Sequence, residues 1–261
     1  MKNQIWLVLL AVLLLSAASC SRQNLEPLEG KVWFSVDEAY DPPYDSGYPQ
    51  ITLSLSTDKV YPDIQRTIAA DVRAVGPLVS VDIRGIQCPD VLFQTPGPAR
   101  SNWPLCIGDG QYLCQLSYGW DSDWCSLTIT DSYVRTSLIE GSFSDSPSDL
   151  CWRHPVNSFA YICGTTVEDT WVYDDFLDSL RSRVSLTEFS FPDSGEIPYP
   201  RSSAGHYRDM PARYFRYQKD SDFQEAGRVL EEYSKNVLRQ RMGVGIMLVD
   251  WKNRRHTSWE S

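Results

Sequence analysis

The sequence lacks the features that identify several large classes of protein. Its longest apolar run, residues 5–15, has eleven residues, whereas a helix that spans a bilayer needs about 20. Acidic side chains outnumber basic ones by 34 to 24, and no run of lysine and arginine relieves the net charge of −10. Because such a charge repels phosphate backbones, we expect no nucleic-acid partner.

Motifs for metal, nucleotide and nucleophilic chemistry are also missing. The sequence has no HExxH motif, GxSxG elbow, Walker loop, EF-hand pattern or CxxC pair. It has three histidines, His154, His206 and His256, and their spacing suggests no shared metal site. We therefore predict no metal and no cofactor, and no motif assigns an enzymatic activity.

The composition is nevertheless that of a folded protein, with 42% apolar and 12% aromatic residues. At about 150 residues per domain, a chain of 261 residues predicts one or two domains. A chain of this length can bury a large core without help from metals.

The first twenty residues have the pattern of a secretory signal peptide. Lys2 is the only charged residue before Cys20, and small residues follow the apolar run. The segment Ser16-Ala17-Ala18-Ser19-Cys20 resembles the bacterial lipobox, although Ala17 stands where leucine is usual. The resemblance implies a lipid on Cys20 and cleavage before it, which leaves a signal peptide at 1–19 and a tether and N-terminal segment at 20–49. The alternative is an ordinary signal peptide that is cleaved nearby.

The lipobox resemblance also implies a cellular location and a membrane as the partner. A lipid on Cys20 would attach the protein to a membrane. Ser21 follows the cysteine, and under enterobacterial sorting serine at this position directs a lipoprotein to the outer membrane. We therefore expect a lipid-anchored protein of the cell envelope.

Six cysteines remain after Cys20, and an even number in an exported chain predicts disulfides. Two of them lie outside the region of the other four, so we pair them with each other. Free buried thiols are the alternative. The predicted pairs are Cys151–Cys163, Cys88–Cys106 and Cys114–Cys125.

Residues 50–140 have the pattern of a β-sandwich. Gln50–Ser56 alternates apolar and polar residues, as a half-buried strand does. The segment Asp109–Cys114 resembles the corner of immunoglobulin domains, where a tyrosine two residues before a cysteine bonds back to the turn. The resemblance implies an immunoglobulin-like sandwich, but the presumed B strand has no cysteine for the usual disulfide. Further short strands are predicted at 67–75, 79–86, 91–93, 103–107, 112–118 and 127–130.

Residues 141–261 have the pattern of a small α/β domain that matches no known family. Val172, Phe176, Leu180 and Val184 recur every fourth residue and predict a helix. A strand at 185–191, a second helix from Ser221 and a buried strand at 244–251 complete the pattern. The long loop at 192–219 contains one short predicted strand near 212–217. The predicted fold is therefore mainly β plus α/β.

One candidate ligand site lies on the loop that follows the strand at 112–118. Exposed tryptophans stack on sugar rings, and nearby carboxylates accept hydrogen bonds from sugar hydroxyls. The two aspartates are also potential Ca²⁺ ligands if other oxygens join them. The alternative is a polar turn whose tryptophans fold onto the core. The residues are Tyr118, Trp120, Asp121, Asp123 and Trp124.

A second candidate site lies in the 192–219 loop. Serine, histidine and aspartate together resemble the residues of nucleophilic hydrolases, although residues so close in one loop rarely align as a triad. Tyrosine and arginine in the same loop suit a ligand or protein surface. A solvated or packing loop is the alternative. The candidate ligand-binding residues are His206, Tyr207 and Asp209, beside Ser202 and Ser203; the surface would use Tyr199, Tyr207, Arg213, Tyr214, Arg216 and Tyr217.

These observations favour a non-enzymatic envelope lipoprotein with a binding or assembly role. Its partner would be an unidentified envelope protein or glycan. Two alternatives remain open, namely a hydrolase that acts on an envelope glycan or peptide, and a lectin-like carbohydrate binder.

Overall fold

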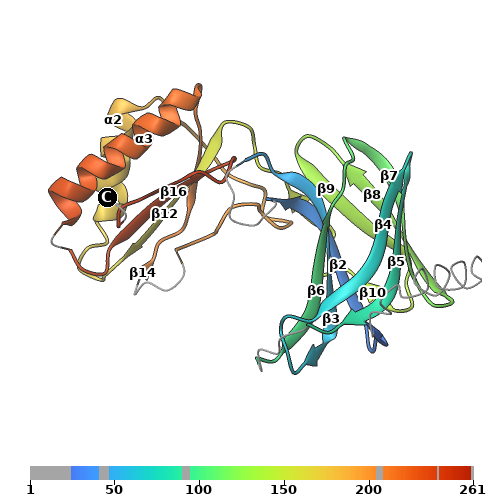
Figure 1. Ribbon diagram of the computed structural model, residues 1–261. Coiled ribbons are helices and arrows are strands. Elements are labelled where there is room, and N and C mark those ends of the chain that lie inside the picture. The colour runs from blue at the N-terminus through green and yellow to red at the C-terminus, as the bar shows by residue number, and fades with distance from the viewer. Residues whose placement is uncertain (1–24, 41–46, 90–94, 204–207, 240, 260–261) are drawn as a thin grey trace, which may run out of the picture.

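The computed structural model describes residues 25–40, 47–89, 95–203, 208–239 and 241–259 (Figure 1). In this part the chain is mostly β, with seventeen strands in three sheets and two α-helices. The prediction of a β-rich fold is confirmed. The signal peptide, Cys20, His206, Tyr207 and the predicted strand at 91–93 lie outside the described residues.

The first sheet has the strand order β1-β5-β7-β8-β9-β11, and β4 pairs with β5. Most neighbours are antiparallel, but β5 and β7 are parallel because the chain between them crosses to the other sheet as β6. The strands are β1 (Leu25–Glu26), β4 (Thr67–Val75), β5 (Leu78–Gln87), β7 (Gly110–Tyr118), β8 (Asp121–Ile129), β9 (Tyr133–Glu140) and β11 (Leu150–Trp152).

The second sheet has the order β10-β2-β3-β6 and shares one apolar core with the first. Alternation along β2 sends Val32, Phe34 and Val36 into this core, where all three are buried. The bounds are β2 (Val32–Ala39), β3 (Gln50–Tyr61), β6 (Gly97–Pro104) and β10 (Ser144–Asp145).

The β-rich part is longer than the predicted 50–140. The sequence places residues 32–39 in an N-terminal segment, but they form β2 and pair with β3 along eight residues. Residues 144–152 were assigned to the C-terminal domain, but they form β10 and β11 in the first two sheets. The two sheets therefore use residues 25–152.

Tyr112 makes the bond that its sequence context predicts. Its hydroxyl donates to the carbonyl oxygen of Gly108 at 3.0 Å. This contact ties the start of β7 to the turn before it.

The third sheet is antiparallel throughout, in the order β13-β15-β12-β16-β17, and β14 also pairs with β12. Both helices cover one face (Figure 1). On the other face Tyr199 packs with Ala160, Ile162 and Val249. The elements are β12 (Ser158–Thr165), α2 (Val172–Arg183), β13 (Thr187–Phe189), β14 (Arg208–Asp209), β15 (Arg213–Arg216), α3 (Asp220–Tyr233), a π-helical turn (Ser234–Leu238), β16 (Gly245–Asp250) and β17 (Arg255–Thr257).

The six cysteines in the described part are free thiols, which differs from the predicted disulfides. Cys151 lies on β11 of the first sheet and Cys163 on β12 of the third, so these two belong to different sheets. Cys88 is half-buried with its sulfur 3.2 Å from Glu26, and Cys106 is exposed. Only Cys114 and Cys125 face each other directly, on paired strands in the core.

Candidate functional site

The predicted glycan or calcium site at 118–124 is divided between a tight turn and the core. Trp120 is fully exposed in the turn between β7 and β8, whereas Trp124 is half-buried on β8. Asp123 is completely buried and accepts five hydrogen bonds from residues 142–144. Since its oxygens are already used, Asp123 does not share a calcium ion with Asp121, and no metal-binding cluster occurs in the described ranges. The hydroxyl of Tyr118 accepts the backbone N–H of Leu28.

The 192–219 loop is largely packed against the third sheet. Ser203 donates to the Asp209 carboxylate at 2.6 Å, but the histidine that a triad would need lies outside the described residues. Tyr199 and Tyr217, predicted for a binding surface, are buried instead. Arg213 is held by Glu188 through two hydrogen bonds. Of that predicted surface, Arg216 stays exposed.

A buried ionic cluster joins the second sheet to the start of the third. Glu38 on β2 accepts hydrogen bonds from Arg153 Nε at 2.7 Å and from the backbone N–H of His154 at 2.8 Å. Arg153 also donates to Asp109 at 2.8 Å. The side chains of Glu38 and His154 are each only 5% exposed. Burial alone would raise the pKa of Glu38, but the bonds from His154 and Arg153 outweigh it and lower that pKa.

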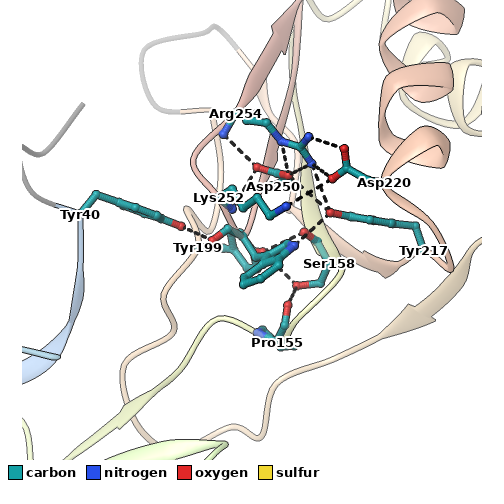
Figure 2. Close-up of polar contacts among 10 residues, drawn as sticks. Tyr40, Pro155, Ser158, Tyr199, Tyr217, Asp220, Asp250, Lys252 and Arg254 are labelled. Atoms are coloured by element: carbon teal, nitrogen blue, oxygen red, sulfur yellow. Dashed lines mark hydrogen bonds and ion pairs between the residues drawn. The ribbon is translucent and has the colours of Figure 1, made fainter. Parts of the chain in front are cut away.

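A second contact lies beside this cluster. Tyr40 donates its hydroxyl to the carbonyl oxygen of Trp251 at 2.8 Å (Figure 2). Trp251 belongs to the turn after β16, and its indole N–H donates to Tyr217 at 3.0 Å. The ring of His154 lies between those of Tyr40 and Tyr199, at 5.3 and 5.0 Å.

The turn that receives Tyr40 is fixed by a buried carboxylate. Asp250, fully buried at the end of β16, accepts the backbone N–H groups of Lys252 and Arg254. The Arg254 guanidinium bonds to both Asp250 and Asp220 (Figure 2), and these bonds raise the pKa of Arg254. Burial raises the pKa of nearby Tyr217 to about 12. Hydrogen bonds and ion pairs around Asp250 therefore fix the turn that receives Tyr40.

Two adjacent hollows open along this junction, with volumes of about 390 and 300 Å³. They share three lining residues, so we treat them as one groove, the junction groove. Trp152, Phe189 and Phe191 supply apolar walls in the larger hollow. The smaller hollow contains Tyr48 and Trp251 beside the Glu38 cluster. The shared residues are Asp131, Arg153 and Val156.

The walls of the larger hollow are braced by ring contacts. Phe191 packs edge-on against Phe189 at 5.4 Å and against Tyr214 at 5.1 Å. The indole N–H of Trp152 donates to the Ser194 carbonyl at 2.8 Å. These contacts preform an apolar surface before a ligand arrives.

Arg216 supplies an available positive charge in the same hollow. Its guanidinium lies 5.4 Å from the centre of the Phe189 ring, a cation–π arrangement. It forms no ion pair with any other residue that the structure describes. Arg153, by contrast, is neutralised by Glu38 and Asp109. The groove thus combines an aromatic wall with one unpaired cation.

Comparison with protein-family models, curated proteins and solved structures finds no match to this chain. In the described ranges, no helix is both long enough and apolar enough to span a bilayer.

Proposed function

We propose that the protein is a lipid-anchored envelope protein that binds a ligand in the junction groove. The ligand would carry an apolar, preferably aromatic, group and one anionic group. The observation that carries this proposal is the stacked Arg216–Phe189 pair on the wall of a 390 Å³ hollow. Ligand sites of this size are typically apolar with a few polar groups that orient the ligand.

The geometry suggests how such a ligand would lie. Its apolar part would cover Phe189 and Phe191, and its anion would accept hydrogen bonds from Arg216. Asp131 also lines the hollow and would disfavour a second negative charge there. A single carboxylate, sulfonate or phosphate beside a ring fits this distribution.

The surroundings of His154 favour ligand binding over hydrolysis as the function of the junction groove. Its Nδ1 atom lies 3.2 Å from Glu38, an arrangement that can orient an imidazole as a base. However, no serine, threonine or cysteine lines the smaller hollow in the described ranges, and the serines of the larger hollow, Ser132 and Ser190, make no hydrogen bond to the imidazole, whose described partner is Glu38. An imidazole packed between two tyrosine rings is better suited to hold the junction together.

The binding proposal can be tested with anilinonaphthalene sulfonate, which has an aromatic body and one anion. We expect saturable fluorescence with one site per chain. Arg216→Glu should weaken binding by about tenfold, because a charge-assisted bond is replaced by repulsion. Arg228→Glu makes the same charge change at an exposed position of α3 and serves as the control. Equal loss in both variants, or no saturable binding, would overturn the proposal.

The anchor is a separate part of the proposal and has its own test. Mass spectrometry of the protein extracted from membranes should find a diacylglyceryl group on Cys20 as the first residue. Cys20→Ala should leave the leader uncleaved by the lipoprotein peptidase. An unmodified N-terminus elsewhere in the native protein would refute the anchor without touching the groove.

A further inference from the structure

We propose that the outer face of the second sheet binds a neutral glycan, with Trp33 as the stacking residue. This site is distinct from the junction groove and does not depend on it. It is also distinct from the turn at Trp120, because it lies on different strands of the other sheet.

The pairing register places six side chains in a grid on this face. Val32, Phe34 and Leu55 point into the core, so the residues that alternate with them point outward. Strands β2, β3 and β6 lie side by side (Figure 1). One row across the strands is Trp33, Ser56 and Arg100, and the next is Ser35, Ser54 and Asn102.

The grid lines a shallow hollow of about 250 Å³, which Pro147 borders from the chain after β10. Trp33 is 36% exposed, and Arg100 and Asn102 are exposed at the sheet edge. Neighbouring strands are about 4.8 Å apart, so Trp33 and Arg100 are separated by about 10 Å. The hollow therefore spans the three strands, and its volume fits a short stretch of a glycan rather than a larger compact ligand.

The polar side chains of the grid are not engaged by other residues in the described part of the protein. None of the side chains of Ser35, Ser54, Ser56, Arg100 and Asn102 makes a hydrogen bond or ion pair with another residue in the described part. Arg66, in contrast, is paired with Glu26, and Arg84 with Asp71. The donors and acceptors of the five grid side chains therefore remain available to a ligand.

The chemistry of the grid matches a sugar better than a protein or an ion. The C–H face of a pyranose is weakly positive and packs on the negative face of an indole. Serine hydroxyls both donate and accept, and the amide and guanidinium add paired donors, which suits vicinal hydroxyls. Among the described residues that line the hollow, Arg100 alone is charged, and the molecule as a whole is acidic, so a neutral glycan fits better than a polyanion.

The test is affinity electrophoresis of the full chain in native gels that contain dextran, xylan or mannan. We expect at least one of the three to retard the wild-type protein. Trp33→Ala should weaken that binding by about tenfold, and Trp33→Tyr should retain most of it because the ring remains. Trp120→Ala is the matched control, since it removes a more exposed tryptophan from the turn between β7 and β8.

A second variant guards against misfolding of Trp33→Ala. Arg100→Gln with Asn102→Ala changes only exposed positions and should weaken binding without altering the melting temperature. Retardation by none of the three polysaccharides would overturn the proposal. Unchanged binding in Trp33→Ala, or equal loss in Trp120→Ala, would also overturn it. The Arg216→Glu variant should bind the polysaccharide normally, which separates this site from the junction groove.

Discussion

Glu38 and His154 are hydrogen-bonded across 116 residues of chain, with the Glu38 carboxylate accepting the His154 backbone N–H at 2.8 Å. We expect Glu38→Ala to lower the free energy of unfolding by about 3 kcal/mol, because Arg153 would lose its buried partner. Chemical denaturation measures the change. Glu29→Ala is the control, since Glu29 makes an exposed pair with Lys59 that should contribute little. Equal effects of the two substitutions would contradict a structural role for the buried cluster.

Asp123 provides a test of whether the turn at 118–124 binds calcium. Asp123→Ala should destabilise the fold by about 3 kcal/mol, because five donors lose their acceptor. Asp121→Ala should have little effect at its exposed position. Calcium should leave the melting temperature of the wild type unchanged. A calcium-dependent rise that Asp121→Ala abolishes would instead show that the turn binds calcium.

Asp123 also predicts a dependence on pH. Burial opposes ionisation of Asp123, but hydrogen bonds from Ser144 and Ser142 outweigh it and hold its pKa below 3.8. Its stabilisation is therefore full above pH 3.8 and is lost as the pH falls through the folded-state pKa. Acid unfolding followed by circular dichroism should show a shallower acid limb for Asp123→Asn than for the wild type. Identical acid limbs would argue against this assignment.

Gly227 on α3 faces His256 so closely that a side chain does not fit. A Cβ atom there would lie 2.5 Å from His256 Cε1. Glycine to alanine in a helix usually stabilises by about 1 kcal/mol, but Gly227→Ala should instead lower the melting temperature. In a His256→Ala background the same substitution should raise it. A double-mutant cycle measures this change of sign, and additive effects would refute the contact.

His256 itself should make stability fall on acidification. Burial, together with nearby Arg254, holds its pKa below 6.5. The unfolded chain therefore binds this proton more readily than the folded protein. Stability should decrease as the pH drops from 6.5 towards the folded-state pKa. The slope of unfolding free energy against pH in this window should flatten in His256→Gln, and an unaltered slope would rule out its contribution.

Cysteine reactivity should follow exposure. Cys106 is exposed and should be alkylated first, as peptide mapping after brief iodoacetamide treatment can show. Cys125 and Cys163 should react slowly, since the pKa of the Cys163 thiol is raised to about 11 by burial, and that of Cys125 is raised by the adjacent Cys114 thiol and by burial. Isolation of a Cys114–Cys125 cross-linked peptide from untreated protein would instead establish the predicted disulfide.

Periodic segments were predictable because their pattern reflects burial directly. The spacing of Val172, Phe176 and Leu180 predicted α2, and their side chains are buried as expected. The tyrosine of the predicted corner makes its expected bond. Strand β12 was missed, because its residues are buried on both faces and so show no alternation.

The junction groove could not be predicted from local pattern. Arg153, Phe189 and Arg216 come from three separate segments and meet only through the pairing of β13, β15 and β12. Trp33 was overlooked for a related reason, since its grid depends on the register of β2, β3 and β6. The local signal for this face in the sequence is that Trp33 and Ser35 alternate with the buried apolar residues of β2.

The short link between β11 and β12 limits how the protein can be divided. Only residues 153–157 separate the last strand of the first sheet from the central strand of the third. Two of these five residues, Arg153 and His154, are bonded to Glu38. A fragment that ends at residue 140 would lose β10 and β11, and one that ends at residue 152 would leave Glu38 without Arg153 and His154. A cut after His154 would still remove the Trp251 carbonyl to which Tyr40 donates. Truncation therefore offers no neutral cut point, and the two halves are best expressed and purified as one continuous polypeptide.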